Sequence, residues 1–532
     1  MEKTKGSSYL KQASILVAAG LIVRFIGFLY RLPLTALWGD TGNAIYSAGY
    51  QVYNFLLILS SAGLPAAIGK MVSERMALGE YENAHRVFRV ALLGCGTLSA
   101  IFMVGLWVLA EWISVTICKI PDSYYALMTL APTILIVGIM SVFRGYFQGM
   151  NTMVPTAISQ IVEQIFNAVA SVVLAYLLVR HSVALASAGG TAGTGIGALA
   201  GLLVMFVTYT KERPMLFEKI RQTGQGQRET AGQIGKTLVC TAFPIILGTA
   251  IYSITNLADM SMVMERLLTA GFSSDEAEIL YGQLQGKYVV LTTMPVAIST
   301  AMATAAVPTI AASAVLKDTA AVRRKINMAV KIAMVISIPA AVGMGVLAHQ
   351  ILLMLFPTSA EGGELLTVGS ISILFLALSQ IVTGTLQGIG KVHVPAINAA
   401  FGAVVKIVLN YVLIVIPAIN VQGAVISTIA CYAVASLLNL WALKKAVGFW
   451  PDLVGALVKP AIAAAVMGVV CYGAYQVLSG LGNTPATLLT IAVSIVVYAV
   501  VLLKSKGLSE EEIQSMPMGN RLVGLCKKTK LL

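Results

Sequence analysis

Apolar runs of about twenty residues recur along the whole chain. A helix of that length crosses the hydrocarbon core of a bilayer, which is roughly 30 Å thick. The intervals between the runs are mostly short and polar, so consecutive helices are expected to pack antiparallel. The pattern predicts an all-α polytopic membrane protein with about fourteen transmembrane helices, near residues 12–32, 44–69, 88–112, 124–147, 154–179, 184–209, 236–259, 284–312, 326–350, 364–389, 394–417, 420–443, 456–478 and 484–503.

Composition agrees with this pattern. Of the 532 residues, 58% are hydrophobic and 11% are charged, against about 25% charged in soluble domains. The net charge of +13 is spread over short intervals instead of one basic patch, so no nucleic-acid partner is expected. The six cysteines and four histidines are scattered without metal-ligand spacing, which predicts neither a disulfide framework nor a metal site.

The positions of Lys and Arg predict the orientation, because cytoplasmic loops are enriched in them. Alternate intervals carry most of these cations, which places both termini in the cytoplasm. Outside the spans, the exceptions are Lys119, Arg180 and Arg266. The basic intervals are 70–89, 211–236, 317–331, 444–445 and 504–530.

Three short matches indicate an internal repeat. Residues 62–65 (AGLP) resemble residues 305–308 (AAVP), and Glu163 with Asn167 stands at the same offset from Lys406 with Asn410. The motif at 145–149 (GYFQG) returns at 384–388 (GTLQG). Parallel repeats of this kind are a transporter architecture. They predict a six-helix lobe at 1–210, a basic cytoplasmic linker at 211–235, a second lobe at 236–445, two further helices at 446–505 and a cytoplasmic tail at 506–532.

Charges inside the spans are the first candidates for function, because they are costly in lipid. Arg24 and Arg31 lie in the first predicted span, and their seven-residue spacing places them on one helical face. Lys287 lies in the outer part of the eighth span. Three cations facing one cavity would bind an anionic headgroup such as a diphosphate. The alternative for Arg31 and Lys287 is snorkelling to the interface.

Four other charged residues are candidates for coupling or gating. Glu163 and Lys406 occupy matching repeat positions with opposite charges, so they could form an ion pair that distinguishes two conformations. Glu163 could instead carry a coupling proton, and a fixed ion pair between helices is the structural alternative. Asp40 and Asp259 lie at the outer ends of spans and are candidate gate partners or ordinary loop acids.

Glycines at 193, 197 and 201 resemble a phosphate-binding loop only superficially, since no strand precedes them. Their spacing of four within a span predicts close helix packing.

Several segments resemble a known family. They are residues 10–16 (LKQASIL), 31–34 (RLPL), 39–42 (GDTG), 62–74 (AGLPAAIGKMVSE), 77–81 (ALGEY), 86–89 (RVFR) and 143–149 (FRGYFQG), followed by Pro155 and Glu163. Together they resemble the SpoVB/YtgP branch of the polysaccharide transporters. That branch belongs to the multidrug/oligosaccharidyl-lipid/polysaccharide (MOP) exporter superfamily, which includes the MurJ-type lipid II flippases.

The resemblance implies a flippase of the bacterial inner membrane. It implies two six-helix lobes around a cavity, a lipid-facing groove at the last two helices, and alternating access. The implied substrate is an undecaprenyl-diphosphate-linked sugar for cell-wall, spore-cortex or polysaccharide synthesis, moved from the inner to the outer leaflet. Arg24 and Arg31 match cavity arginines of the family, with the second one residue further along, and Lys287 replaces an arginine. No cofactor is implied; membrane potential, H⁺ or Na⁺ would drive transport, and cell-wall enzymes are possible partners.

Three other functions remain open at this point. A cation-coupled drug or metabolite antiporter of the same superfamily would favour acidic residues in its cavity. A membrane glycosyltransferase or polymerase would need a catalytic carboxylate on a sizeable outer loop. The longest outer interval, 260–283, is acidic but short, and no structure is expected in it. A scaffold for cell-wall enzymes is the third.

Overall fold

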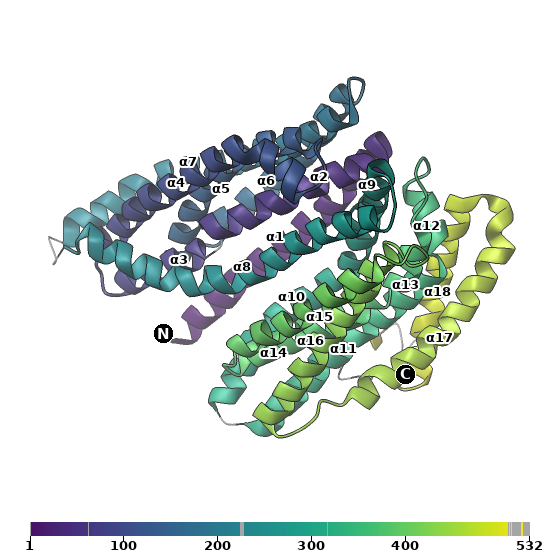
Figure 1. The fold of residues 1–532 in the computed structure, drawn as a ribbon. Helices are drawn as coiled ribbons and strands as arrows, with labels where there is room; N and C mark the ends of the chain where they lie inside the picture. Colours follow the sequence, from purple (N-terminus) through teal and green to yellow (C-terminus); the bar gives the residue numbers. More distant parts are fainter. Residues whose placement is uncertain are drawn as a thin grey trace. The chain divides into compact units, whose positions relative to one another are not determined.

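The computed structural model is helical throughout the residues it describes (Figure 1). These are residues 2–61, 63–223, 228–316 and 318–508, together with Glu510, Glu512, Val523 and Gly524. Several predicted features lie outside them: Ala62 of the first repeat motif, residues 224–227 of the linker, Lys317, and most of the tail at 506–532. The side chains of Ala305 and Pro308 are likewise not described.

The chain forms two compact units. The first contains residues 1–268 and 272–282, and the second contains residues 269–271 and 283–532. Each unit is a bundle of long helices. The predicted boundaries of the lobes, linker and final helix pair stay predictions.

The helices of the first unit begin and end at recognisable signals. Pro65 and Pro155 stand at the first turns of α3 and α6, where the missing amide proton of proline is not needed. The helices are α1 (Glu2–Leu29), α2 (Arg31–Ser61), α3 (Leu64–Ala77), α4 (Tyr81–Trp112) continued by a π-helical turn (Ile113–Ile117), α5 (Ser123–Gly149), α6 (Val154–Leu178), α7 (Val183–Thr223), α8 (Ala231–Thr269) and α9 (Ser274–Gln283).

In the second unit, Asp318 and Asp452 cap α11 and α17 by accepting hydrogen bonds from Ala321 N and Gly455 N, both at 2.9 Å. Gly448 ends α16 in the left-handed region. The elements are η2 (Leu284–Tyr288, a π-helical turn), α10 (Val289–Val315), α11 (Thr319–Val346), α12 (Ala348–Leu355), α13 (Gly363–Gly369), α14 (Ser372–Gly388), α15 (His393–Leu413), α16 (Gln422–Val447), α17 (Leu453–Leu478), η3 (Ser479–Leu481, 3₁₀) and α18 (Asn483–Lys504).

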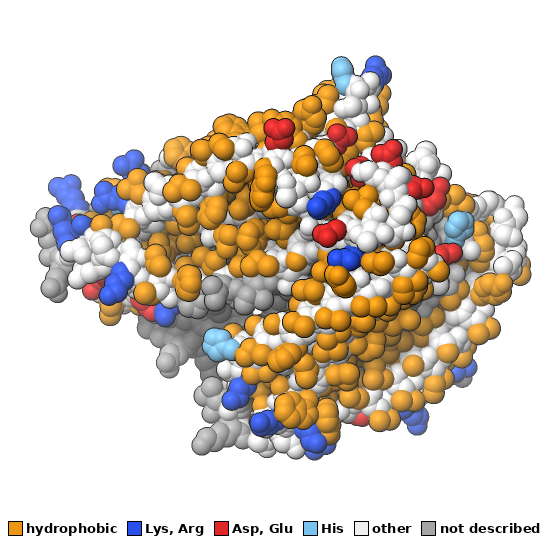
Figure 2. Space-filling model, in the orientation of Figure 1, with side chains coloured by type: hydrophobic (Ala, Val, Ile, Leu, Met, Phe, Trp, Pro, Cys, Tyr) orange, Lys and Arg blue, Asp and Glu red, His pale blue; other side chains and the backbone are white. Residues whose placement is uncertain are grey.

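The surface is that of a multi-pass membrane protein. Among the described residues, ten helices are long and apolar enough to cross a membrane, or eleven if the bent pair α13–α14 is one span. On the face shown in Figure 2, hydrophobic side chains cover most of the helix surfaces, and Lys and Arg lie mainly near helix ends. The prediction of an all-α membrane protein is therefore confirmed, whereas the number fourteen stays a prediction.

Glycines pack helices together in both units. In α7, a Cβ on Gly197 would overlap the carbonyl of Glu163 in α6, and one on Gly193 would overlap the backbone of Ser171. This confirms the close packing predicted for that glycine series. The repeated glycines Gly145 and Gly384 likewise abut other helices, at Pro65 and Ala303 respectively.

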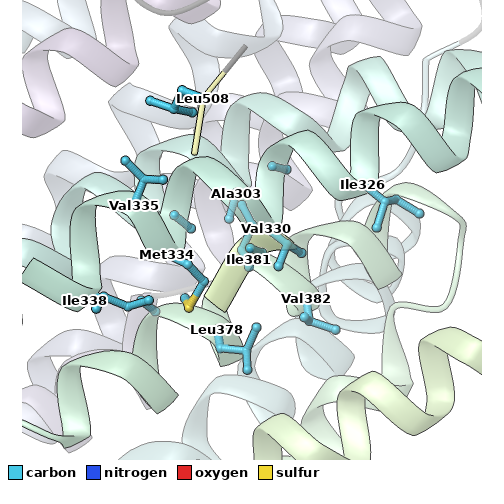
Figure 3. Packing of buried hydrophobic residues seen from close by; sticks show 14 of the residues in the cluster. Ala303, Ile326, Val330, Met334, Val335, Ile338, Leu378, Ile381, Val382 and Leu508 are labelled. Carbon is cyan, nitrogen blue, oxygen red and sulfur yellow. The ribbon is translucent and has the colours of Figure 1, made fainter. Parts of the chain in front are cut away.

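Apolar side chains fill the second unit between α10, α11, α14, α16, α17 and α18. Figure 3 shows part of this cluster, with Val330, Met334 and Ile338 of α11 beside Leu378 and Ile381 of α14. Leu508, beyond the end of α18, is only 7% exposed and belongs to the same cluster. Part of the predicted tail is therefore packed into the bundle.

Candidate functional site

The predicted first span is interrupted near its C-terminal end. Helix α1 stops at Leu29 and α2 starts at Arg31. The helix α2 then bends at Gly39, whose φ of 67° and ψ of −161° are not helical. Glycine takes such a positive φ without the steric penalty of a side chain.

The bend brings the two parts of α2 against each other. Along a straight helix, Arg31 and Tyr46 would be about 22 Å apart, but the Arg31 Cζ lies 5.3 Å from the centre of the Tyr46 ring. Trp38 Nε1 and Thr35 Oγ1 both donate to Asn43 Oδ1, at 3.0 and 3.1 Å. These contacts across Gly39 hold the fold-back closed.

The Tyr46 ring beside the Arg31 guanidinium belongs to a chain of tyrosine contacts. The hydroxyls of Tyr30 and Tyr46 are 3.3 Å apart. Tyr46 stacks on Tyr50 with centroids 5.8 Å apart, and Tyr50 lies 5.6 Å from Tyr53. A cation over a desolvated aromatic face is stabilised by up to about 2 kcal/mol. We call Tyr30, Arg31, Tyr46, Tyr50 and Tyr53 the arginine–tyrosine cluster.

The charge of Arg31 is not neutralised by an acid within the part of the chain that the structure describes, where no ion pair to it or to Arg24 occurs. Arg24 is exposed on α1. Arg24 lies on α1 and Arg31 begins α2, and the expectation that the two arginines share a face stays a prediction.

Two apolar grooves of about 440 and 460 Å³ lie between α6 and the chain before and after Arg31. Tyr30, just before Arg31 in the sequence, lines the first groove, and Pro33, just after it, lines the second. Val172 and Val173 of α6 line both. The remaining lining residues are Ile26, Leu29, Ala168 and Val169 in the first and Ala36, Leu37, Tyr176 and Leu177 in the second.

Glu163 forms an ion pair inside the first unit. Its Oε2 accepts a hydrogen bond from Arg144 Nη2 at 2.7 Å. Arg144 also donates from Nε and Nη2 to Ser159 Oγ, at 3.0 and 2.9 Å. This network ties α5 to α6. The predicted pairing of Glu163 with Lys406 stays a prediction, since Lys406 is half-buried on α15 of the other unit.

Lys287 is 1% exposed in the π-helical turn before α10. Its Nζ donates to Ser359 Oγ and to the Glu361 carbonyl, both at 3.0 Å. These bonds connect the turn to the segment between α12 and α13. The ammonium is therefore engaged within the second unit, and its predicted convergence with Arg24 and Arg31 stays a prediction.

The two candidate gate acids are both buried in the first unit, Asp40 at 7% exposure and Asp259 at 6%. Asp40 follows the bend at Gly39, and a Cβ on Gly282 of α9 would overlap the Asp40 carbonyl. The bend of α2 is thus packed against α9. The gate role of both acids stays a prediction.

The outer interval is helical, contrary to expectation: α8 continues to Thr269 and α9 covers Ser274–Gln283. A reciprocal cap starts α9, where Glu276 Oε2 accepts from Ser273 N and Glu276 N donates to Ser273 Oγ. Burial, and then the charges of Asp122 and Asp275, raise the pKa of Glu278 to about 7. The Ser273 bonds lower the pKa of Glu276.

Sequence reasoning missed Arg144, the tyrosines around Arg31, and a clamp at the start of α8. In the clamp, Glu229 accepts two hydrogen bonds from Arg75, one of 2.9 Å from Nε and one of 2.5 Å from Nη2. Arg75 and Glu229 are far apart in the sequence, so only the presence of arginines near the ends of spans could have indicated this clamp. Among the described residues, no group of three His, Cys, Asp or Glu could hold a metal ion.

Comparison with known proteins adds to this geometry. Residues 9–314 match the family described as polysaccharide biosynthesis protein, and residues 289–412 match the MatE family. The first match covers more than half of the chain. The chain belongs to the polysaccharide biosynthesis protein family. The predicted resemblance to MOP-superfamily polysaccharide transporters is thereby confirmed.

Similar proteins span nearly the whole chain. Stage V sporulation protein B of Bacillus subtilis (strain 168) is 24% identical over 523 residues, covering 97% of this chain and 99% of that protein. Lipid II flippase MurJ of the same organism is 26% identical over 486 residues, covering 87% and 88%. The named transporters and flippases among these relatives support a transport function over an enzymatic one.

Solved structures share the fold. An inward-facing MATE family transporter of the MOP superfamily aligns with a TM-score of 0.68 and 16% identity, covering 80% of this chain and 95% of that one. An inward closed lipid II flippase MurJ aligns with a TM-score of 0.66 and 15% identity, covering 91% and 97%. At these identities the likeness shows the fold alone.

Proposed function

We propose that this member of the polysaccharide biosynthesis protein family is a flippase for an undecaprenyl-diphosphate-linked sugar, which it moves from the inner to the outer leaflet by alternating access. The observation that carries the proposal is Arg31. It is a cation in a membrane-spanning region, held against a tyrosine ring without an acid partner among the described residues. Such a cation is costly in lipid unless a ligand or water compensates it.

The chemistry of the arginine–tyrosine cluster suits a diphosphate. The guanidinium carbon of Arg31 lies over the Tyr46 ring, and a guanidinium carries a planar fork of N–H donors that can bind two phosphate oxygens side by side. The apolar grooves beside Tyr30 and Pro33 give a polyprenyl chain an apolar path close to that cation. A diphosphate without such a cation faces a prohibitive desolvation cost in the membrane.

The remaining candidates have supporting roles in this proposal. Arg24 and Lys287 would add positive charge to the substrate path, although Lys287 must first leave Ser359. The ion pair of Glu163 with Arg144 is a candidate for coupling or gating, and its opening would expose a carboxylate to H⁺ or Na⁺. Lys406, Asp40 and Asp259 are proposed gate residues, with α17 and α18 as the lipid-facing groove.

Reconstituted vesicles test the proposal. Fluorescent lipid II is placed in both leaflets, and the fraction reached by a membrane-impermeant quencher is followed after an imposed potential. We expect the Arg31→Gln variant to lose at least about tenfold in rate, since a charge-assisted contact contributes about 1.5–3 kcal/mol. The control Arg180→Gln removes an exposed arginine from the turn after α6 and should stay within about twofold. Equal rates for parent, Arg31→Gln and protein-free vesicles would refute the proposal.

A cation-coupled antiporter is the second candidate, favoured by the MatE match at residues 289–412 and by the shared MATE fold. It predicts efflux of a cationic dye against a proton or sodium gradient. Because an uncompensated Arg31 repels cations, we expect no dye efflux by the parent. Dye efflux together with absent lipid II transfer would replace the flippase with the antiporter.

A further inference from the structure

Basic residues follow one face of α11 in the second unit. Arg323, Asn327 and Lys331 are spaced by four, so their side chains succeed one another along the helix. They line a cavity of about 490 Å³, together with Ala320, Arg324, Met328, Asp452 and Glu512. We call this cavity the basic pocket. It lies far along the chain from the arginine–tyrosine cluster and belongs to the other unit.

The arginines of the basic pocket are available to a ligand. Both Arg323 and Arg324 are exposed, and within the described ranges no carboxylate forms an ion pair with either. The Arg323 Cζ lies 5.2 Å from the centre of the Phe449 ring, a cation–π contact that favours this position of the guanidinium. Asp452 already accepts the capping hydrogen bond of Gly455 N, so its carboxylate is committed to the start of α17.

Glu512, from the tail, forms an ion pair with Lys331, the third cation of the basic pocket. Both oxygens of Glu512 accept hydrogen bonds from Lys331 Nζ, at 2.8 and 2.7 Å. Earlier in the tail, Lys459 Nζ donates to the Lys506 carbonyl at 2.9 Å, and Leu508 is buried in the apolar cluster near Val335 (Figure 3). The pocket thus already holds one anionic group, supplied by the chain itself.

We propose that the basic pocket is a binding site for a phosphate-bearing anion, and that Glu512 is its built-in competitor. Two exposed arginines and a lysine on one helical face match the oxygens of a phosphate, which arginine binds through parallel N–H donors. With Glu512 displaced, the pocket holds the three cations and one carboxylate, that of Asp452, which already accepts a hydrogen bond from Gly455 N. The pocket lies among the intervals predicted to be cytoplasmic, where membranes carry anionic headgroups.

The test measures binding of inorganic diphosphate to the full-length protein in neutral detergent by calorimetry. Every protein carries Arg24→Gln and Arg31→Gln, so that the site proposed in the first unit does not contribute. Glu512→Gln should bind about two- to fivefold tighter, because an ion pair of this exposure contributes up to about 1 kcal/mol. Arg323→Gln/Arg324→Gln should bind at least about tenfold more weakly.

Two variants outside the cavity control for the loss of a single charge. Glu510→Gln removes a tail carboxylate that does not line the cavity, and Lys391→Gln removes an exposed cation between α14 and α15; neither should change the affinity more than about twofold. Monodispersity and melting temperature establish folding, and Arg323→Lys/Arg324→Lys should recover part of the binding. Loss of diphosphate binding in Lys391→Gln equal to that in the arginine variant would overturn the proposal, as would equal affinities of the parent and Glu512→Gln.

A second probe, short-chain phosphatidic acid in mixed micelles, identifies the source of the phosphate. Tighter binding of phosphatidic acid than of diphosphate, sensitive to the arginine pair, assigns the site to a lipid headgroup. Equal binding assigns it to a free phosphate group. Failure of both probes to bind the Glu512→Gln protein overturns the site.

Discussion

Replacing Arg144 by leucine removes the partner of a mostly buried carboxylate. The two side chains are 14% and 24% exposed. Arg144 also donates two hydrogen bonds to Ser159 Oγ. Breaking a fully buried ion pair costs about 3–5 kcal/mol, whereas exposed pairs contribute at most about 1 kcal/mol. For this exposure we expect Arg144→Leu to lower the free energy of unfolding by about 2–3 kcal/mol.

A double-mutant cycle measures the coupling between Arg144 and Glu163. Glu163→Leu alone leaves the guanidinium without its acid and should cost about 1–2 kcal/mol. The double variant removes both charges, so its loss should be smaller than the sum of the single losses by about 1–2 kcal/mol. Arg180→Leu, at an exposed turn, serves as the control and should change stability by less than about 0.5 kcal/mol.

Denaturant titration in mixed micelles measures these free energies, with helical circular dichroism as the signal. A coupling free energy below about 0.5 kcal/mol would refute the idea that the Arg144–Glu163 pair holds α5 against α6. The same result would weaken the proposal that opening this pair is part of coupling.

Three further predictions concern other parts of the molecule. The pKa of Glu278 is raised to about 7 from an ordinary 4.5, so the folded protein binds this proton more tightly than the unfolded chain does. Stability should therefore fall as the pH rises from about 4.5 to about 7. Glu278→Gln should flatten that part of a profile of melting temperature against pH. Gly197→Leu should cost more than 3 kcal/mol or prevent folding, because the glycine abuts the Glu163 carbonyl, whereas Gly105→Ala, with open space around it, should change the melting temperature little or raise it. Glu229→Gln should weaken the clamp on Arg75 and accelerate hydrogen exchange at the start of α8, which mass spectrometry of peptides from this region measures.

The membrane class and most helix positions could be predicted from the sequence, because apolar runs of bilayer length leave little choice of structure. The fold-back of α2 on itself could not. It depends on Arg31 and Trp38 finding Tyr46 and Asn43 across the bend at Gly39. Nothing in the apolar pattern indicates contacts of that kind.

Helix α9 is a different case, since its signal was present in the sequence. Ser273 and Glu276 have the spacing of a capping box, and the structure shows the reciprocal bonds. The acidic composition of the interval obscured that signal. The partner of Glu163 was hidden for another reason: Arg144 is on the preceding helix, and a single sequence does not show which faces of α5 and α6 meet.

The most direct measurement of the central claim is the binding of undecaprenyl lipids that differ only in headgroup. Native mass spectrometry of the full-length protein compares undecaprenyl diphosphate with undecaprenol, for the parent, Arg31→Gln and Arg180→Gln. Recognition of the diphosphate by Arg31 predicts a preference of at least about tenfold for the diphosphate in the parent and in Arg180→Gln, reduced to near equality in Arg31→Gln. Equal binding of the two lipids by the parent, or an undiminished preference in Arg31→Gln, would contradict the account.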